Sequence, residues 1–232
     1  MKLGLLGDIH GNSCALQAVL SAARPRGVEK LLVTGDLIGY YFHPAEVLAA
    51  LAEWEVFLVR GNHEEMLTKA RTESAFLSSV DLKYGSGLRC AMEQLQDKQL
   101  GELCRLPHPL DLEIDGCRIL LCHGSPWDAD QYIYPDSEPA LMERCVDRKH
   151  DLVVLGHTHY PMLQKIGKTL IVNPGSVGQP RNRKPGAQWA LFDTVNRTVE
   201  FLSEAYDPAP LVEESLCRHP GLPYMADVLT RS

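Results

Sequence analysis

Eight side chains that can bind metal ions lie at or near glycines, and these glycines border short apolar segments. The side chains are those of Asp8, His10, Asp36, Asn62, His63, His123, His157 and His159. Carboxylate, amide and imidazole donors without a thiolate suit Mn, Fe, Zn, Co or Ni, and the many imidazoles disfavour a site for Mg or Ca alone. The set is large enough for two divalent cations that share one carboxylate and leave a position for water. Two cations roughly 3.5–4 Å apart can acidify such a water and stabilise the attacking and leaving oxygens of an in-line displacement at phosphorus.

The elements that would position these side chains alternate between strand and helix in the first third of the chain. Apolar runs predict strands at 2–6, 30–34 and 56–59, and helical spacing predicts helices at 12–23 and 44–54. Either Asn12 or Ser13 is a natural N-cap for the first helix. Alternation of this kind predicts a largely parallel sheet with right-handed crossovers. The carboxyl ends of parallel strands line one crevice, so the polar clusters after these strands are expected to converge there.

The direction of the side chains supports this expectation. In an extended stretch residues i and i+2 point the same way, so Asp8 and His10 can share a target, and so can His157 and His159. A single Gly-Asp after a strand is usually a turn, and a single His-Gly is less informative still. Five such clusters on one rim are difficult to explain by chance, which favours a common metal site.

The sequence pattern changes from helical to strand-like after a long helical stretch. Residues 64–106 are polar and helical in pattern, with a glycine break at 84–87, and would fit a cap over the site. Strands at 112–114 and 118–122 are predicted to form a hairpin around Asp115-Gly116. A helix is expected at 139–149, then strands at 152–155, 162–166, 169–172, 188–193 and 198–202.

The C-terminal residues and the order of elements along the chain predict the fold class. Residues 203–232 are expected to form a C-terminal helical tail, with two short helices split at 220–223. We predict a single α/β domain over residues 1–232, with the helical cap-like insertion inside it. Its architecture is expected to be a four-layer α/β/β/α sandwich of two mixed β-sheets flanked by helices.

Composition restricts the partners of the protein. The 232 residues carry a formal net charge of -7, which argues against binding of long nucleic acids but leaves a small phosphorylated substrate open. No apolar stretch approaches the ~18 residues of a membrane span and no N-terminal charged-then-apolar segment is present, so we expect no membrane contact and a cytoplasmic location. The seven cysteines are scattered without a Cys-x-x-Cys pair, which is typical of reduced thiols. The sequence does not indicate an oligomeric state.

The polar clusters, taken in order, resemble the motif set of the calcineurin-like metallophosphoesterase superfamily. The matching segments are 7–12, 35–36, 61–64, 123–124 and 156–159. Segment 173–181 and the tail at 206–223 resemble those of small bacterial and archaeal phosphodiesterase-like members. That branch is related to the diadenosine tetraphosphatases and the Ser/Thr phosphatases. The resemblance is specific for the fold and the metal site and leaves the substrate open.

The resemblance also implies a role for each position. It places Asp8, His10 and His159 on a first metal ion and Asn62, His123 and His157 on a second, with Asp36 bridging the two. His63 would face the scissile phosphate as a general acid or as a stabiliser of developing charge, which suits an imidazole near neutral pH. Arg60 resembles the phosphate-holding arginine of the Ser/Thr phosphatases, and a surface ion pair is the alternative for it. Mn²⁺ is the expected metal, with Fe, Zn, Ni or Co as alternatives.

The sequence departs from those relatives after the second motif. Asp36 is followed by Leu-Ile-Gly-Tyr-Tyr, where the Ser/Thr phosphatases and the bacterial diadenosine tetraphosphatases continue to residues that include an arginine. This departure disfavours a protein phosphatase and leaves the orienting partner of His63 unassigned. Asn12, Tyr40 and Arg181 are predicted substrate contacts, with Tyr40 stacking on a base and Arg181 binding a second phosphate. Packing of the loop and a solvated basic loop are the respective alternatives for Tyr40 and Arg181.

The leading hypothesis is a dinuclear-metal-dependent phosphoesterase that hydrolyses phosphodiester or nucleotide-type esters through a metal-bridging hydroxide. A diadenosine-polyphosphate hydrolase and a broad phosphomonoesterase or protein phosphatase are alternatives of the same class. A non-catalytic scaffold with the same fold is an alternative of another class, and it predicts lost ligands, whereas this sequence retains them. A mononuclear iron oxygenase would need only three ligands in an all-β setting, which the strand–helix opening does not fit.

Overall fold

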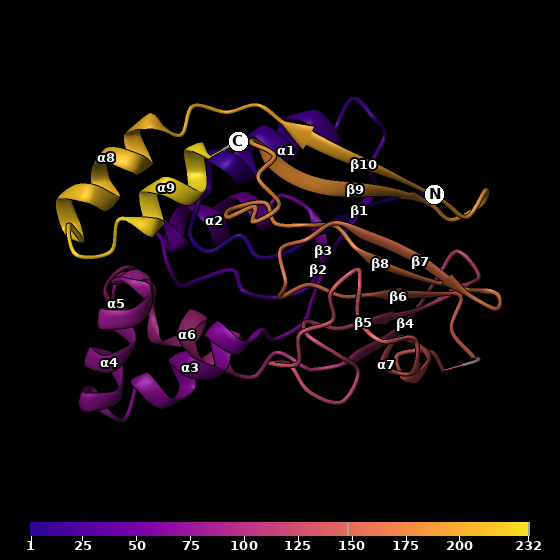
Figure 1. Ribbon diagram of the computed structural model, residues 1–232, viewed down its shortest axis with the longest axis horizontal. Helices are drawn as coiled ribbons and strands as arrows, with labels where there is room; N and C mark the ends of the chain where they lie inside the picture. The colour runs from indigo at the N-terminus through magenta and orange to yellow at the C-terminus, as the bar shows by residue number, and fades with distance from the viewer. Residues whose placement is uncertain (148, 232) are drawn as a thin grey trace.

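Two β-sheets stacked face to face form the centre of the molecule, and helices cover their outer faces (Figure 1). The computed structural model describes residues 1–147 and 149–231. Within that part of the chain, ten strands form two five-stranded sheets, in the orders β10-β9-β1-β2-β3 and β4-β5-β6-β8-β7. The predicted α/β/β/α sandwich of two mixed sheets is therefore confirmed.

The first sheet contains the three parallel strands that the sequence predicts. Strand β1 pairs with β2 and β2 pairs with β3, both in parallel, while β9 runs antiparallel to β1. Helices α1 (Ser13–Ala23) and α2 (Pro44–Leu51) make the two crossovers. The strands are β1 (Lys2–Leu6), β2 (Lys30–Val33), β3 (Glu55–Leu58), β9 (Ala187–Asp193) and β10 (Thr198–Glu204).

The second sheet opens with the predicted hairpin. Strands β4 and β5 are antiparallel around Asp115 and Gly116, whose φ angles of 53° and 69° are those of a left-handed two-residue turn. Strands β5, β6 and β8 are parallel, and β7 is antiparallel to β8. The strands are β4 (Leu110–Ile114), β5 (Cys117–Leu121), β6 (Leu152–Val154), β7 (Met162–Ile166) and β8 (Thr169–Asn173).

Helix α7 is shorter than predicted. It covers Pro139–Arg144, and Cys145 already caps it, whereas a helix to residue 149 was expected. Arg148, which the expected helix included, lies outside the described residues. The backbone N–H of Asp151 instead donates to the carbonyl of Arg118, so the approach to β6 is already engaged with the second sheet.

Apolar side chains from both sheets fill the space between them. Leu5 and Leu32 of the first sheet are fully buried there together with Leu121 and Val154 of the second. Helix α1 packs on the opposite face of the first sheet, where Leu16 belongs to a second apolar cluster. Strands covered on both faces are apolar throughout, which explains the unbroken apolar runs in the sequence.

The segment for which a cap was predicted contains four helices beside the edge where the strands end (Figure 1). They are α3 (Asn62–Ala70), α4 (Ser74–Tyr84), α5 (Gly87–Gln94) and α6 (Asp97–Cys104). The helical character of this stretch agrees with its sequence pattern. Asn62 is the first residue of α3, so the strand–loop–helix junction after β3 holds the third polar cluster.

The C-terminal helices α8 (Ala209–Arg218) and α9 (Tyr224–Thr230) pack against that helical segment. The hydroxyl of Tyr224 donates to the carbonyl of Lys83 at 2.7 Å, and the backbone N–H of Ser86 donates to Nε2 of His219 at 3.0 Å. The tail is therefore bonded directly to the helical segment. Among the residues described, no helix has the length and apolar character needed to span a bilayer.

Candidate metal centre

The polar clusters lie in loops that leave the strands with left-handed backbone, and this differs from the extended geometry that the sequence suggested. Asp8, His10 and Asp36 have φ angles of 52°, 51° and 52°, and His157 and His159 have 65° and 62°. Residues other than glycine adopt this region at a cost, so it persists only where the surroundings enforce it. Here the backbone N–H groups of Asp8 and His10 donate to the carbonyls of Gly35 and Asp36, at 3.2 and 2.9 Å.

The side chains nevertheless converge in two neighbouring groups. Asp8, His10 and His159 offer ligand atoms that all lie within 4.8 Å of one another, and so do Asp36, His123 and His157. The expectation that His157 and His159 share a target through strand alternation is therefore wrong. The left-handed φ does not by itself decide this, because Asp8 and His10 have a similar φ and belong to one group.

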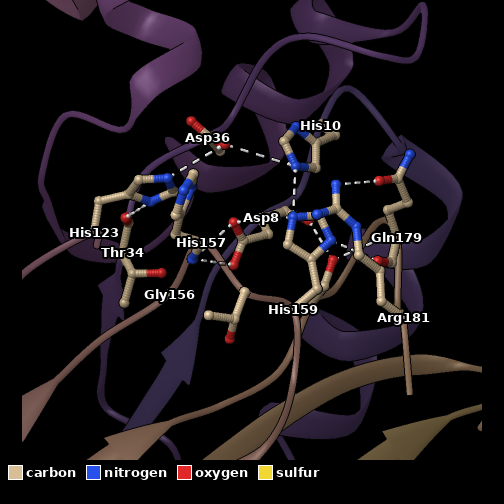
Figure 2. Close-up of polar contacts among 12 residues, drawn as sticks. Asp8, His10, Thr34, Asp36, His123, Gly156, His157, His159, Gln179 and Arg181 are labelled. Atoms are coloured by element: carbon tan, nitrogen blue, oxygen red, sulfur yellow. Dashed lines mark hydrogen bonds and ion pairs between the residues drawn. The ribbon is translucent and has the colours of Figure 1, made fainter. Parts of the chain in front are cut away.

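Asp36 lies between the two groups (Figure 2). Its Oδ2 atom is 3.7 Å from Nε2 of His10 and 3.4 Å from Nε2 of His123. Nε2 of His123 is in turn 3.0 Å from Oδ1 of Asn62. A third combination, His10 with Asp36 and His63, also meets the 4.8 Å spacing.

Backbone carbonyls fix the orientation of three of the imidazoles. Nδ1 of His10 donates to the carbonyl of Ile38 at 3.2 Å, and Nδ1 of His159 donates to that of Gln179 at 2.6 Å. Nδ1 of His123 donates to the carbonyl of Thr34 at 2.6 Å. Because a carbonyl can only accept, each Nδ1 carries the proton and each Nε2 is directed inward as a potential ligand.

The pair His10 and His159 tests whether these residues fit a cation. Their Nε2 atoms are 3.2 Å apart, and both Nδ1 atoms already hold protons, so in the neutral rings two lone pairs face each other. Two nitrogens at about 2.1 Å from one cation and at right angles to it would lie about 3 Å apart. The arrangement fits a shared cation and gives no favourable contact otherwise.

Burial keeps most of the imidazoles neutral. It places the pKa of His10 and of His159 well below the usual value, and burial together with the neighbouring His123 lowers the pKa of His157 to about 3. Nε2 of His157 has no hydrogen-bond partner among the described residues. Neutral imidazoles with inward lone pairs are the form that binds metal ions.

The two carboxylates differ in their surroundings. Burial raises the pKa of Asp8 to about 7. Burial also disfavours the charge on Asp36, but His123 and His63 beside it outweigh that effect and hold its pKa well below the usual value. For His123 burial acts against the charge, and Asp36 nevertheless raises its pKa to about 9. Because metal ligands must lose their protons, a cation at Asp36 would compete with the proton on His123.

His63 is held by packing. Its ring centroid is 4.9 Å from that of His10, 5.1 Å from Tyr40 and 5.3 Å from Tyr84. Nδ1 of His63 is buried and has no partner within the described chain. A Cβ on Gly39 would lie 2.1 Å from that atom, so only glycine permits this approach. The ring of His63 is therefore positioned by the surrounding aromatic rings, with no hydrogen bond from Nδ1 to a described residue.

A pocket of about 240 Å³ opens over these groups, and several of its walls were not predicted. Lys83 and Tyr84 reach it from the end of α4, and Asp130 and Tyr132 reach it from the loop after β5. The sequence break after Tyr84 hinted at the first pair. No sequence pattern marked the second pair, because only the folding of a long loop brings it to the site. The pocket is lined by His10, Asp36, Tyr40, Asn62, His63, Lys83, Tyr84, Asp130, Tyr132, His157, His159 and Arg181.

The predicted substrate contacts have different surroundings. Tyr40 and Arg181 line the pocket, and Nη2 of Arg181 donates to the Tyr40 hydroxyl at 3.2 Å. Asn12 is fully buried outside it, where its amide caps α1 and donates to the carbonyl of Gly178. Arg60 does not line the pocket either. It pairs with Glu65 at 2.9 Å, which agrees with the alternative role predicted for it, a surface ion pair.

Glu64 organises the loops around the centre, a role that sequence reasoning missed. Its buried carboxylate accepts hydrogen bonds from the backbone N–H groups of Gly61, Asp36 and Leu37, at 2.8, 2.9 and 2.9 Å. The first of these closes the N-terminus of α3 as in a capping box. The other two hold the loop after β2, so one side chain fixes Asp36 relative to His63.

We expect Glu64→Ala to lower the free energy of unfolding by about 3 kcal/mol or more. The three buried N–H groups named above, and also that of Ile38 at 3.4 Å, lose their acceptor at about 1–3 kcal/mol each. Urea unfolding of the purified variant measures this loss. Glu65→Ala is the matched control, because its neighbouring carboxylate makes only a surface ion pair with Arg60. Equal, small losses in both variants would contradict the role given to Glu64.

Known proteins resemble this chain over nearly its whole length. A model of the calcineurin-like phosphoesterase superfamily domain matches residues 1–197. Phosphodiesterase YfcE of Escherichia coli K12 is 26% identical over 214 residues, which cover 88% of this chain and 94% of that protein. A metallophosphoesterase from Sphaerobacter thermophilus superposes with a TM-score of 0.80 at 28% identity, over 100% of this chain and 98% of that one. The hypothetical protein PH1004 from Pyrococcus horikoshii OT3 has the same fold, with a TM-score of 0.84 at 23% identity over 99% and 98% of the two chains.

Proposed function

Because this chain belongs to the calcineurin-like phosphoesterase superfamily and is a hydrolase of phosphate esters, we propose that it acts on phosphodiester or nucleotide-type esters with two divalent cations, preferably Mn²⁺. YfcE, which resembles this chain over nearly its whole length, is a phosphodiesterase. This supports a phosphodiester rather than a phosphoprotein as the substrate. The absence of an arginine in residues 37–41 points in the same direction.

The observation that carries the proposal is the position of Asp36. Its carboxylate lies within 3.7 Å of His10 in one group and within 3.4 Å of His123 in the other. A carboxylate between two sets of inward imidazoles is the donor arrangement that a pair of cations needs. We propose Asp8, His10 and His159 as ligands of one cation, Asn62, His123 and His157 as ligands of the second, and Asp36 as the bridge.

The cations and the pocket side chains have separate proposed roles in the reaction. When bound, the two cations supply an acidified water as nucleophile and neutralise charge on the phosphoryl oxygens. His63 is proposed to donate a proton to the departing oxygen or to stabilise its charge, since its ring faces the pocket and is no part of the two main groups. Arg181, which also lines the pocket, is proposed to bind a phosphate oxygen. Tyr40 holds the Arg181 guanidinium in place.

The first test is hydrolysis of bis(4-nitrophenyl) phosphate and 4-nitrophenyl phosphate by protein stripped of metal and reloaded with Mn²⁺. We expect turnover only after reloading, about two Mn²⁺ per chain in elemental analysis, and a preference for the diester. A preference for the monoester would favour the broad phosphomonoesterase. Absence of both metal binding and turnover would overturn the proposal and favour the non-catalytic scaffold.

A further inference from the structure

A second recess adjoins the metal pocket and shares Arg181 with it. This recess has a volume of about 640 Å³ and is lined by Tyr134, Pro135, Asp136, Tyr160, Arg181 and Arg231. Because Arg181 lines both spaces, the recess lies directly beside the metal pocket. We call this space the tyrosine recess.

A series of aromatic rings leads from the metal centre into the tyrosine recess. The Tyr132 ring lies 4.1 Å from that of His157 and 5.7 Å from that of Tyr134, almost parallel to the latter at 15°. Tyr134 in turn packs edge-on against Tyr160 at 5.8 Å. Tyr132 and Tyr134 are 41% and 37% exposed. Exposed, ordered aromatic faces that line a recess are suited to stacking on a flat ring.

The charges of the tyrosine recess favour an anion. Arg181 and Arg231 face it against the single carboxylate of Asp136, although the whole protein carries a net charge of -7. Nη2 of Arg181 is engaged by Tyr40 and Gln179, at 3.2 and 3.0 Å. Its Nε and Nη1 make no hydrogen bond to any described residue. A guanidinium with two unused donors can bind a phosphate in bidentate fashion.

We propose that the tyrosine recess binds the base and the second phosphate of a nucleotide whose scissile phosphate lies at the metal centre. The base would stack on Tyr134 and the second phosphate would lie between Arg181 and Arg231. This inference rests on the proposed function and narrows its substrates to nucleotide esters with at least two phosphates. A simple phosphomonoester would fill the 240 Å³ pocket alone and leave the recess unused.

Two non-hydrolysable probes separate the base from the phosphates. Methylenediphosphonate carries two phosphorus groups, and adenosine 5′-(α,β-methylene)diphosphate adds the nucleoside to the same unit. Calorimetry with Mn²⁺-loaded protein is expected to show at least about tenfold tighter binding of the nucleoside-bearing probe, as base–aromatic stacking allows. Tyr134→Leu should remove about tenfold of that affinity and leave methylenediphosphonate within about twofold, whereas Arg231→Gln should weaken both probes.

The control is Phe201→Leu, which alters an exposed aromatic side chain on β10 outside the recess and should change neither affinity. Equal binding of the two probes, or an equal effect of Phe201→Leu and Tyr134→Leu, would overturn the proposal. Turnover of bis(4-nitrophenyl) phosphate is followed in the same preparations. Turnover with equal binding of the probes rejects the recess alone, whereas absence of both metal binding and turnover rejects the proposed function.

Discussion

Replacement of Asp36 with asparagine is expected to lower kcat/KM for bis(4-nitrophenyl) phosphate by at least about a thousandfold and to reduce the Mn²⁺ bound per chain. Asp36 is the only carboxylate described within reach of both histidine groups, at 3.7 and 3.4 Å. Its negative charge is what would hold two cations close together. Charge stabilisation by such cations is worth several kcal/mol in the transition state, and about 4 kcal/mol corresponds to about a thousandfold in rate.

Asparagine is chosen because it keeps the shape of the site. Oδ1 of Asp36 accepts from the backbone N–H of His63 at 2.9 Å, and an asparagine oxygen can accept the same bond. The variant should therefore fold, which thermal unfolding checks. Asp111→Asn is the matched control, since that aspartate pairs with Lys149 on the surface. A variant that retains wild-type Mn²⁺ content and activity would refute the bridging role.

The convergence of the candidate metal ligands was predictable because its signal is local. Asp8, Asp36 and Asn62 each follow an apolar strand and a glycine, and parallel strands bring their carboxyl ends to one rim. The side-chain direction was not predictable from that pattern. Alternation along a strand holds only while the backbone stays extended. The pairs Asp8/His10 and His157/His159 are all left-handed, yet only the first pair shares a group. The separation of His157 and His159 into two groups thus depends on hydrogen bonds between loops, which a sequence does not display.

Arg60 and Arg181 show how far substrate contacts could be predicted from the sequence. Arg60 adjoins a motif in the sequence, yet Glu65 one turn along α3 pairs with its guanidinium at the surface. Arg181 lies far from most of the motifs in sequence and reaches the pocket because its loop folds back over β1, where the N–H of Gly178 donates to the carbonyl of Asp8. Of the two arginines beside a motif segment, only Arg181, at the end of segment 173–181, lines the pocket. Asp130 and Tyr132 arrive at the pocket in the same way, from a loop without a recognisable pattern.

The role of the helical segment depends on similar long-range contacts. Its helices were predictable from composition, but the position of Lys83 at the pocket mouth depends on the tail, because the Tyr224 hydroxyl binds the Lys83 carbonyl. The four helices thus meet the site at two helix ends, the start of α3 with Asn62 and His63 and the end of α4 with Lys83 and Tyr84. We propose that this segment forms one wall of the substrate pocket, as a cap would.

His63→Ala is expected to lower kcat for phosphodiesters by about 10²–10⁴-fold, the usual contribution of a positioned acid or base, without loss of Mn²⁺. The imidazole faces the pocket, its Nδ1 has no partner in the described part of the chain, and Tyr40 and Tyr84 hold its ring. Proton donation matters most when the departing alcohol is basic. The loss should therefore be larger for an alkyl ester than for the nitrophenyl ester, whose leaving group needs little assistance.

The metal content of this variant decides between two roles for His63, because His63 also lies within ligand distance of His10 and Asp36. Elemental analysis with about two Mn²⁺ per chain, together with a leaving-group-dependent loss of rate, supports the general acid. A fall in Mn²⁺ in parallel with the rate, equal for both esters, would make His63 a ligand. His43→Asn is the matched control: that imidazole pairs with Glu214 outside the pocket, so its loss should leave both the metal content and the rate unchanged. The dependence on the leaving group is the decisive readout, since a merely structural defect would slow both esters alike.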